Sequence, residues 1–318
     1  MYNIKKNIAI IFIFPFLLES CSFQREVISK VVGSDLCASK KIEIIYNYPT
    51  DSKILEIMNH PLLTDFSKKS IQFSIAYDFY LDLIKLKTLE KEEVKKDSFS
   101  NAYLFQKQKV LQQIYFAQAD ISAMESEIHC YEDRFSETII NVKEIESDIV
   151  QKNSFFAILT GGIGTLLDGA SADNPSINKA VILVSGIVIS VFSYLAYDPI
   201  VKIEFSPKST ILKDLWNNPQ KSKSFTDPIW FLLSREYNTD EKSIREILKE
   251  QWEKNGYLGK DDANRARLTN IYFGNGGLCS IREYENRKEM LSETLVKLDL
   301  FQQIIRTFQY EVLFGKVK

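Results

Sequence analysis

The sequence contains few of the residues that build catalytic or metal sites. Its 318 residues include only 2 histidines and 4 cysteines. His129 and Cys130 are adjacent, so on a helix they point in different directions and cannot easily reach one metal ion. The Gly-x-Ser-x-Gly elbow, the Walker loop and the dinucleotide fingerprint are also missing from the sequence. We therefore expect no metal, no cofactor and no catalytic residue, and we predict that the protein is not an enzyme.

Glycine, proline and unbalanced charge are also scarce. The chain has 12 glycines and 8 prolines, too few for a low-complexity or β-rich protein, whereas 45% hydrophobic and 12% aromatic residues can build a core. Its 40 basic side chains nearly balance 42 acidic ones, so the basic excess of nucleic-acid binders is missing. These values predict a mainly α-helical protein that binds no nucleic acid.

The first 21 residues are typical of a bacterial lipoprotein signal. Lys5-Lys6 precede an apolar run, Ile8 to Leu18, whose ~11 residues fall short of the ~20 that cross a bilayer as a helix. The run ends in Leu18-Glu19-Ser20-Cys21, which resembles a lipobox. We predict a signal peptide over residues 1–20 and lipidation of Cys21. The alternative is an ordinary secretory signal with an incidental cysteine, which Glu19 favours because lipoboxes usually have a small or apolar residue there.

Lipidation of Cys21 would place the protein in the bacterial cell envelope. A single acyl chain binds a membrane only marginally, so stable anchoring takes two or more acyl groups, such as palmitate. Ser22, rather than aspartate, follows the cysteine. Under the enterobacterial sorting rule this favours the periplasmic side of the outer membrane.

Three further cysteines, Cys37, Cys130 and Cys279, can form one disulfide in this oxidising compartment. Sequence alone does not choose among the three pairings. Cys37–Cys130 is weakly favoured, because it would tie the N-terminal tether, in the segment 21–100, to the first long helix. The alternative is that all three thiols are buried and unpaired.

Residues 101–152 lack glycine and proline and predict one long helix with a coiled-coil-like seam. One heptad position is filled by Ile114, Ile121, Ile128, Phe135, Val142 and Ile149, and a second by Val110, Ala117, Met124, Tyr131, Thr138 and Ile145.

A C-terminal heptad helix is predicted within residues 280–318, from Ile281 to Phe314 with Ser280 as N-cap. We expect the two long helices to pack on each other as an antiparallel stalk. The alternative is a seam left open for a partner helix or a second copy of the chain.

Between the two long helices, residues 153–198 predict an apolar helical hairpin. Its arms are Phe155 to Leu167 and Ala180 to Tyr197, joined by the polar connector Asp168 to Lys179. Small residues that allow close helix packing are Ala157, Gly161, Thr165 and Gly169 in the first arm and Gly186 in the second. Two interpretations compete: a hairpin inserted in a membrane as transmembrane helices, and the buried centre of a helical domain. The first arm is short for a full crossing, which takes about 20 residues.

The remaining segments predict smaller elements. Residues 199–279 form a Trp-containing helical subdomain, in which Trp216, Trp230 and Trp252 are interpreted as core anchors rather than as a carbohydrate platform. Ile42 to Tyr46 and Val201 to Phe205 alternate in polarity and are expected to pair as two strands. Ser70 to Lys96 is expected to be one helix.

Three short motifs have a resemblance to known proteins: Cys130-Tyr-Glu-Asp-Arg134, Leu212-Lys-Asp-Leu-Trp216 and Phe273-Gly-Asn-Gly-Gly277. Together with the lipobox and the order of the helices, they resemble a group of uncharacterised helical envelope lipoproteins of Bacteroidetes-type bacteria. The resemblance spans most of the mature chain and implies no activity. A looser architectural likeness runs to α-helical pore-forming toxins, in which long helices flank an apolar hairpin.

The sequence therefore predicts a non-enzymatic envelope lipoprotein with a structural, scaffolding or interaction role at the membrane. Its expected partners are the membrane, through Cys21 and the hairpin, and a protein or a second copy of the chain, through the long helices. The alternative function is an α-helical pore-forming or membrane-inserting protein that uses residues 153–198.

Overall fold

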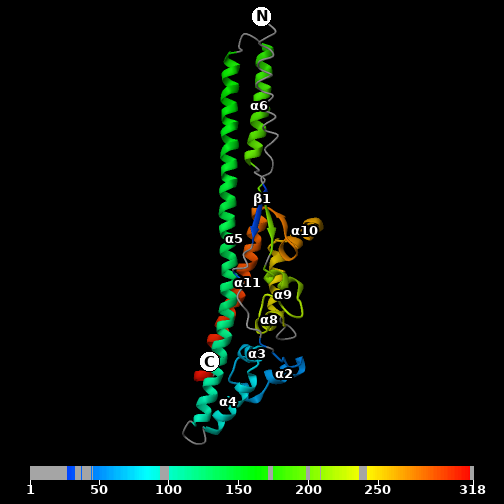
Figure 1. The fold of residues 1–318 in the computed structure, drawn as a ribbon. Coiled ribbons are helices and arrows are strands. Elements are labelled where there is room, and N and C mark those ends of the chain that lie inside the picture. Colours follow the sequence, from blue (N-terminus) through cyan, green and yellow to red (C-terminus); the bar gives the residue numbers. More distant parts are fainter. Residues whose placement is uncertain are drawn as a thin grey trace. The chain divides into compact units, whose positions relative to one another are not determined.

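The structure is a computed structural model that describes residues 27–32, 37, 44, 46–93, 100–170, 175–197, 201–207, 209–235 and 242–315. Most of these residues are helical, so the prediction of a mainly α fold is confirmed. The chain forms two compact units, and the helix α5 (Asn101–Ala170) contributes to both (Figure 1). We call them the stalk unit, with residues 32–136, 206–277 and 285–318, and the hairpin unit, with residues 1–31, 137–205 and 278–284.

The stalk unit is built on the pairing of α5 with α11 (Ile281–Phe314). Gln302 donates a hydrogen bond to Ser122 Oγ at 2.9 Å, and Lys107 Nζ donates to the carbonyl of Leu313 at 3.3 Å. Partner numbers fall along α5 as they rise along α11, so the two helices are antiparallel, as predicted. Figure 1 shows α11 running beside α5.

Most of the predicted heptad seam of α5 is buried, whereas Thr138, Ile145 and Ile149 toward its C-terminal end are half-buried. Val110, Ile114 and Ile121 are almost fully buried, and burial continues through Ile128 to Val142. On α11, the predicted heptad residues Tyr284, Leu291, Leu298, Ile305 and Val312 are buried too. The pairing of two matched apolar stripes explains why each helix is stable at this length.

Helix α5 does not end near residue 152, where the sequence suggested a boundary. It continues through the first apolar segment to Ala170 and has 70 residues, which corresponds to about 105 Å. Nothing in the sequence around Lys152 stops a helix, because glycine first appears at Gly161 and proline at Pro175.

Short helices that precede α5 in the sequence also belong to the stalk unit. They are α2 (Asp51–Met58), the 3-10 turn η2 (Pro61–Leu63), α3 (Lys68–Ala76) and α4 (Tyr80–Glu93). The expected single helix from Ser70 to Lys96 is wrong, because Asp78 adopts a left-handed φ of 54° and breaks it into α3 and α4. The break turns Phe79 onto Phe308 of α11, with ring centroids 5.8 Å apart.

The Trp-containing segment folds into α7 (Ile211–Asn217), α8 (Asp227–Ser234), α9 (Ile244–Lys254) and α10 (Asp262–Phe273). Ser243 and Glu246 form a capping box that fixes the start of α9. Trp252 is fully buried and Trp230 nearly so, and Trp216 stacks on Phe273 with centroids 4.4 Å apart. These contacts are those of core anchors.

A small sheet has the strand order β1-β2-β3, with β1 (Val27–Val32), β2 (Lys202–Ser206) and β3 (Gly277–Cys279). The predicted strand at residues 201–205 is therefore present as β2. Its expected partner over residues 42–46 is wrong: Ile44 and Tyr46, which the structure describes, are not in a strand. Strand β2 instead pairs with β1 and β3, which the alternation of polar and apolar residues did not predict.

Candidate functional site

The hairpin unit contains the apolar hairpin, formed by the C-terminal part of α5 and by α6 (Pro175–Tyr197). Phe156 stacks on Phe192 with ring centroids 5.7 Å apart. A Cβ built on Gly161 would lie 3.4 Å from Ile189 Cδ1. Because partner numbers run in opposite directions, the two arms are antiparallel, and Figure 1 shows them side by side.

Most of the hairpin surface is not covered by protein. Within residues 151–162 and 182–194, only Asn153 and Phe192 are buried. Eight large apolar side chains are exposed on the two arms: Phe155, Ile158, Leu159, Ile182, Leu183, Ile187, Val191 and Tyr194. Contiguous exposed apolar surface of this kind usually marks an interaction site.

The exposed side chains of α6 form a stripe that repeats every four residues. Ile182, Gly186, Ser190 and Tyr194 follow one row, and Leu183, Ile187 and Val191 follow the next. Together they line a shallow hollow of about 600 Å³. The opposite face of α6, with Ile189 and Phe192, contacts α5.

The five small residues that were predicted to lie between the two arms differ in how they contact the opposite arm. Gly161 lies at the contact with α6, and Ala157 is half-buried. Thr165 is exposed, and the side-chain surroundings of Gly169 are outside the described residues. Gly186 is exposed with no atom within 4 Å of a built Cβ, so it does not pack against α5, contrary to the prediction. The sequence could not distinguish the inner from the outer face of α6, because both are apolar.

Hydroxyl groups on the hairpin donate to carbonyls of their own helix. Thr160 donates to Phe156 O at 2.7 Å, and Ser190 donates to Gly186 O at 2.8 Å. Thr165 and Ser185 make the same kind of bond, to Gly162 O and Ile182 O. These groups therefore need no water as a hydrogen-bond partner.

The ends of the apolar stretch are polar. Lys152 is exposed one turn before Phe156 in the first arm, whereas no charged residue occurs from Asn153 to Leu167 or from Ala180 to Tyr197. Asn153 is buried, and its Oδ1 has no hydrogen-bond partner among the described groups. Over the part of the chain that the structure describes, no helix is both long and apolar enough to span a membrane.

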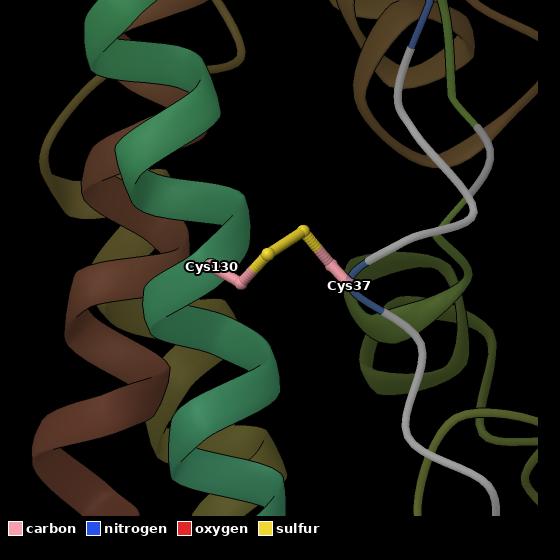
Figure 2. Close-up of a disulfide and its surroundings, with 2 residues drawn as sticks. All are labelled: Cys37 and Cys130. Carbon is pink, nitrogen blue, oxygen red and sulfur yellow. A yellow bond between two sulfur atoms is a disulfide. The ribbon is translucent and has the colours of Figure 1, made fainter.

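A disulfide joins Cys37 to Cys130 of α5, the pairing that the sequence favoured (Figure 2). The bond bridges 93 positions and has a Cα–Cα distance of 5.5 Å. Cys130 lies off the heptad seam, which leaves its side chain free to reach Cys37. Cys279 is buried and outside this disulfide, and its Sγ donates to the carbonyl of Ile203 at 3.5 Å. Cys21, the predicted lipidation site, is outside the described residues.

A polar cluster lies in the stalk unit around Asp120 of α5. Tyr77 Oη donates to Asp120 Oδ2 at 3.0 Å, and Thr226 Oγ1 donates to the same oxygen at 2.7 Å. Burial, followed by the charge of Asp120, raises the pKa of Tyr46 to about 12 and that of Tyr77 well above its usual value. A neutral phenol that donates to a carboxylate is a structural link between helices.

The other polar features do not converge on a reaction centre. A pocket of about 250 Å³ is lined by Ser206, Ser209, Thr210, Lys213 and the α10 end at Tyr272 to Asn275. His60 caps the turn η2 by accepting from Leu62 N, and His129 contacts Glu132 at 3.2 Å. No group of three metal-ligating side chains occurs among the residues with described positions.

Comparisons of the chain with protein-family models, with curated proteins and with solved structures find no match. The resemblance to envelope lipoproteins therefore stays a prediction from the sequence.

Proposed function

We propose that the protein is a non-enzymatic lipoprotein of the bacterial envelope that acts as a scaffold at the membrane. Acyl groups on Cys21 would anchor it, and the paired helices α5 and α11 would present a rigid surface to a protein partner. The observation that carries this proposal is the buried seam from Val110 to Val142, which gives a long, stiff element.

The disulfide supports an oxidising location for this scaffold. Structural disulfides persist in the periplasm and outside the cell, and are rare in the cytosol. Cys37–Cys130 fastens the segment that follows the predicted lipid site to α5. Force on the anchor would then pass to the stalk through a covalent bond.

The anchor is tested by labelling cells with radioactive palmitate. The wild-type protein should take up label and remain in the membrane fraction, and Cys21→Ser should lose the label. Cys279→Ser is the matched control, because Cys279 is a buried thiol and should leave the labelling unchanged. An unlabelled wild-type protein would contradict lipidation.

The scaffold is tested with photo-crosslinking residues at exposed stalk positions. Phe105 and Tyr115 are suitable because both are exposed on α5 and lie off its seam. A discrete cross-linked product from intact cells is expected at one or both. If no stalk position gives a product, the scaffolding role is wrong.

A second candidate is a pore-forming or membrane-inserting protein, which the exposed apolar face of the hairpin favours. In that function several hairpins would associate and make a bilayer permeable. Release of a dye from liposomes by the unlipidated protein distinguishes this candidate from a scaffold.

A further inference from the structure

The exposed face of the hairpin needs a partner of its own. Eight large apolar side chains of the two arms are exposed. Apolar side chains that remain exposed lose the free energy that burial would give them. The surface is therefore unfavourable unless something apolar covers it.

We propose that this face binds the acyl chains of one leaflet of a lipid bilayer, without crossing the bilayer. The inference deepens the proposed function, since it rests on the membrane location, and it names a second contact with the same membrane. It concerns Phe155, Ile158 and Leu159 on α5 and the stripe from Ile182 to Tyr194 on α6.

The polar groups of the hairpin favour lipid over a protein partner. A protein interface normally pairs some hydroxyls or charges across it. Here the hydroxyls of Thr160, Thr165 and Ser190 bond within their own helices, and neither apolar arm has a charge. Surfaces in hydrocarbon must satisfy their polar groups internally in this way.

Aromatic residues mark one level of the hairpin. Phe156 stacks on Phe192, and Phe155 and Tyr194 are their near neighbours in sequence, so all four lie at a similar height along the antiparallel pair. Exposed Lys152 comes one turn before them, and the exposed residues beyond them, such as Ile158 and Ile187, are aliphatic. Cationic and aromatic residues of this kind are common where an apolar surface meets the headgroups.

The length of the apolar stretch favours contact with one leaflet. From Lys152 to Asp168 the helix rises about 24 Å, and the hydrocarbon core is about 30 Å thick. A hairpin that entered end-on would carry Asp168 about 24 Å deep, past the middle of the hydrocarbon core. A hairpin that lies along the membrane plane keeps Lys152 and Asp168 at the headgroups, while its exposed apolar face contacts the acyl chains of one leaflet. The lack of a membrane-spanning helix among the described residues agrees with this arrangement.

The test uses the full chain with Cys21→Ser, so that no acyl group contributes to binding. The protein is floated with vesicles of phosphatidylethanolamine and phosphatidylglycerol, and entrapped dye is monitored. We expect flotation without dye release. Leu183→Asp with Ile187→Asp should lower the vesicle-bound to free ratio at least tenfold, because each carboxylate is costly in hydrocarbon.

Ile140→Asp in the same background is the matched control. Ile140 is 65% exposed and Leu183 is 64% exposed, and both lie on helices of the hairpin unit. Ile140 is outside the apolar stretch, so its substitution should leave flotation unchanged. An equal loss in the control would overturn the assignment of the surface.

Other outcomes also overturn the proposal. If the Cys21→Ser protein does not float, the partner of this face is not lipid. If the protein forms a dimer that the two aspartates dissociate, the partner is another copy of the chain. Dye release would contradict the single-leaflet arrangement and favour the pore. Palmitate labelling of the wild-type chain is independent of these results, so failure of the hairpin and failure of the lipid anchor can be told apart.

Discussion

Two stretches of the same helix, α5, have opposite surroundings. Between Val110 and Val142 its apolar side chains are buried, whereas at Phe155, Ile158 and Leu159 they are exposed. The first stretch packs against α11 and the short helices of the stalk unit, whereas the contacts described for the second stretch are with α6. Apolar side chains of α5 therefore form a packed core in one part of the helix and an exposed surface in the other. The number of helices that pack against each part makes the difference.

The largest difference is expected from truncation of one apolar side chain in each stretch. Ile121→Ala removes a side chain with 0% exposure and should lower the free energy of unfolding by about 2 to 5 kcal/mol. Ile158→Ala, at 75% exposure, should change it by less than about 0.5 kcal/mol. Urea unfolding followed by tryptophan fluorescence measures the stalk unit, because all three tryptophans belong to it. Equal effects would show that the seam is not a packed core.

The disulfide is the next largest contribution to the stalk. Cys37→Ala with Cys130→Ala should lower the free energy of unfolding by about 2 to 4 kcal/mol, because the bond closes a long loop in the unfolded chain. Dithiothreitol should have a similar effect on the wild type and none on the double variant. The urea midpoint of each sample checks this. A wild-type midpoint that ignores reductant would contradict a stabilising role.

A smaller effect is expected from the Asp120 cluster. Tyr77→Phe removes the donor to Asp120 and should lower the free energy of unfolding by about 1 kcal/mol. Asp120→Ala should have a larger effect, about 1 to 3 kcal/mol, because it leaves the buried Tyr77 hydroxyl without this acceptor. The same urea titration gives both values. If Tyr77→Phe costs more than Asp120→Ala, the Tyr77 hydroxyl stabilises the fold through its other acceptor, the carbonyl of Ala117 at 3.5 Å, and not through Asp120.

Alkaline pH should weaken the stalk through its tyrosines. The pKa of Tyr46 is raised to about 12, mainly by burial and then by Asp120, from 10.0 in the unfolded chain. The unfolded state therefore loses its proton first, so stability is full below about pH 10 and falls as the pH rises toward 12. The urea midpoint should decline from pH 9.5 to 11.5, and Tyr46→Phe should make the decline shallower. An unchanged slope in Tyr46→Phe would exclude this residue as a cause.

The smallest effect on stability is expected at the exposed face of the hairpin. Leu183→Ala should change the urea midpoint of the tryptophan signal very little, because Leu183 is exposed and belongs to the other unit. The measurement complements vesicle flotation, in which substitutions on this face have a large expected effect. A large loss of stability would mean that the face is part of a folded core.

Much of the helical framework could be predicted from the sequence. The heptads of α5 and the bounds of α11 follow from apolar spacing, and Ser280 accepts from Glu283 N at the predicted helix start. The break at Asp78 could not be predicted, because neither glycine nor proline marks it in the sequence. Likewise, the pairing of β1 with β2 could not be predicted, because the residues of β1 show no alternation of polar and apolar side chains.

The sequence by itself determined that residues 153–198 form two apolar helical arms and that Cys130 lies off the seam. Only the tertiary structure decided which face of each arm is covered, that Gly161 and not Gly186 meets the opposite arm, and that Cys37 is the partner of Cys130. Apolar composition can be read from a segment of the sequence, and the periodicity of its apolar residues can identify only one buried stripe on a helix. When a helix is apolar on all sides, as α6 is, its inner face is chosen by the neighbours that pack against it.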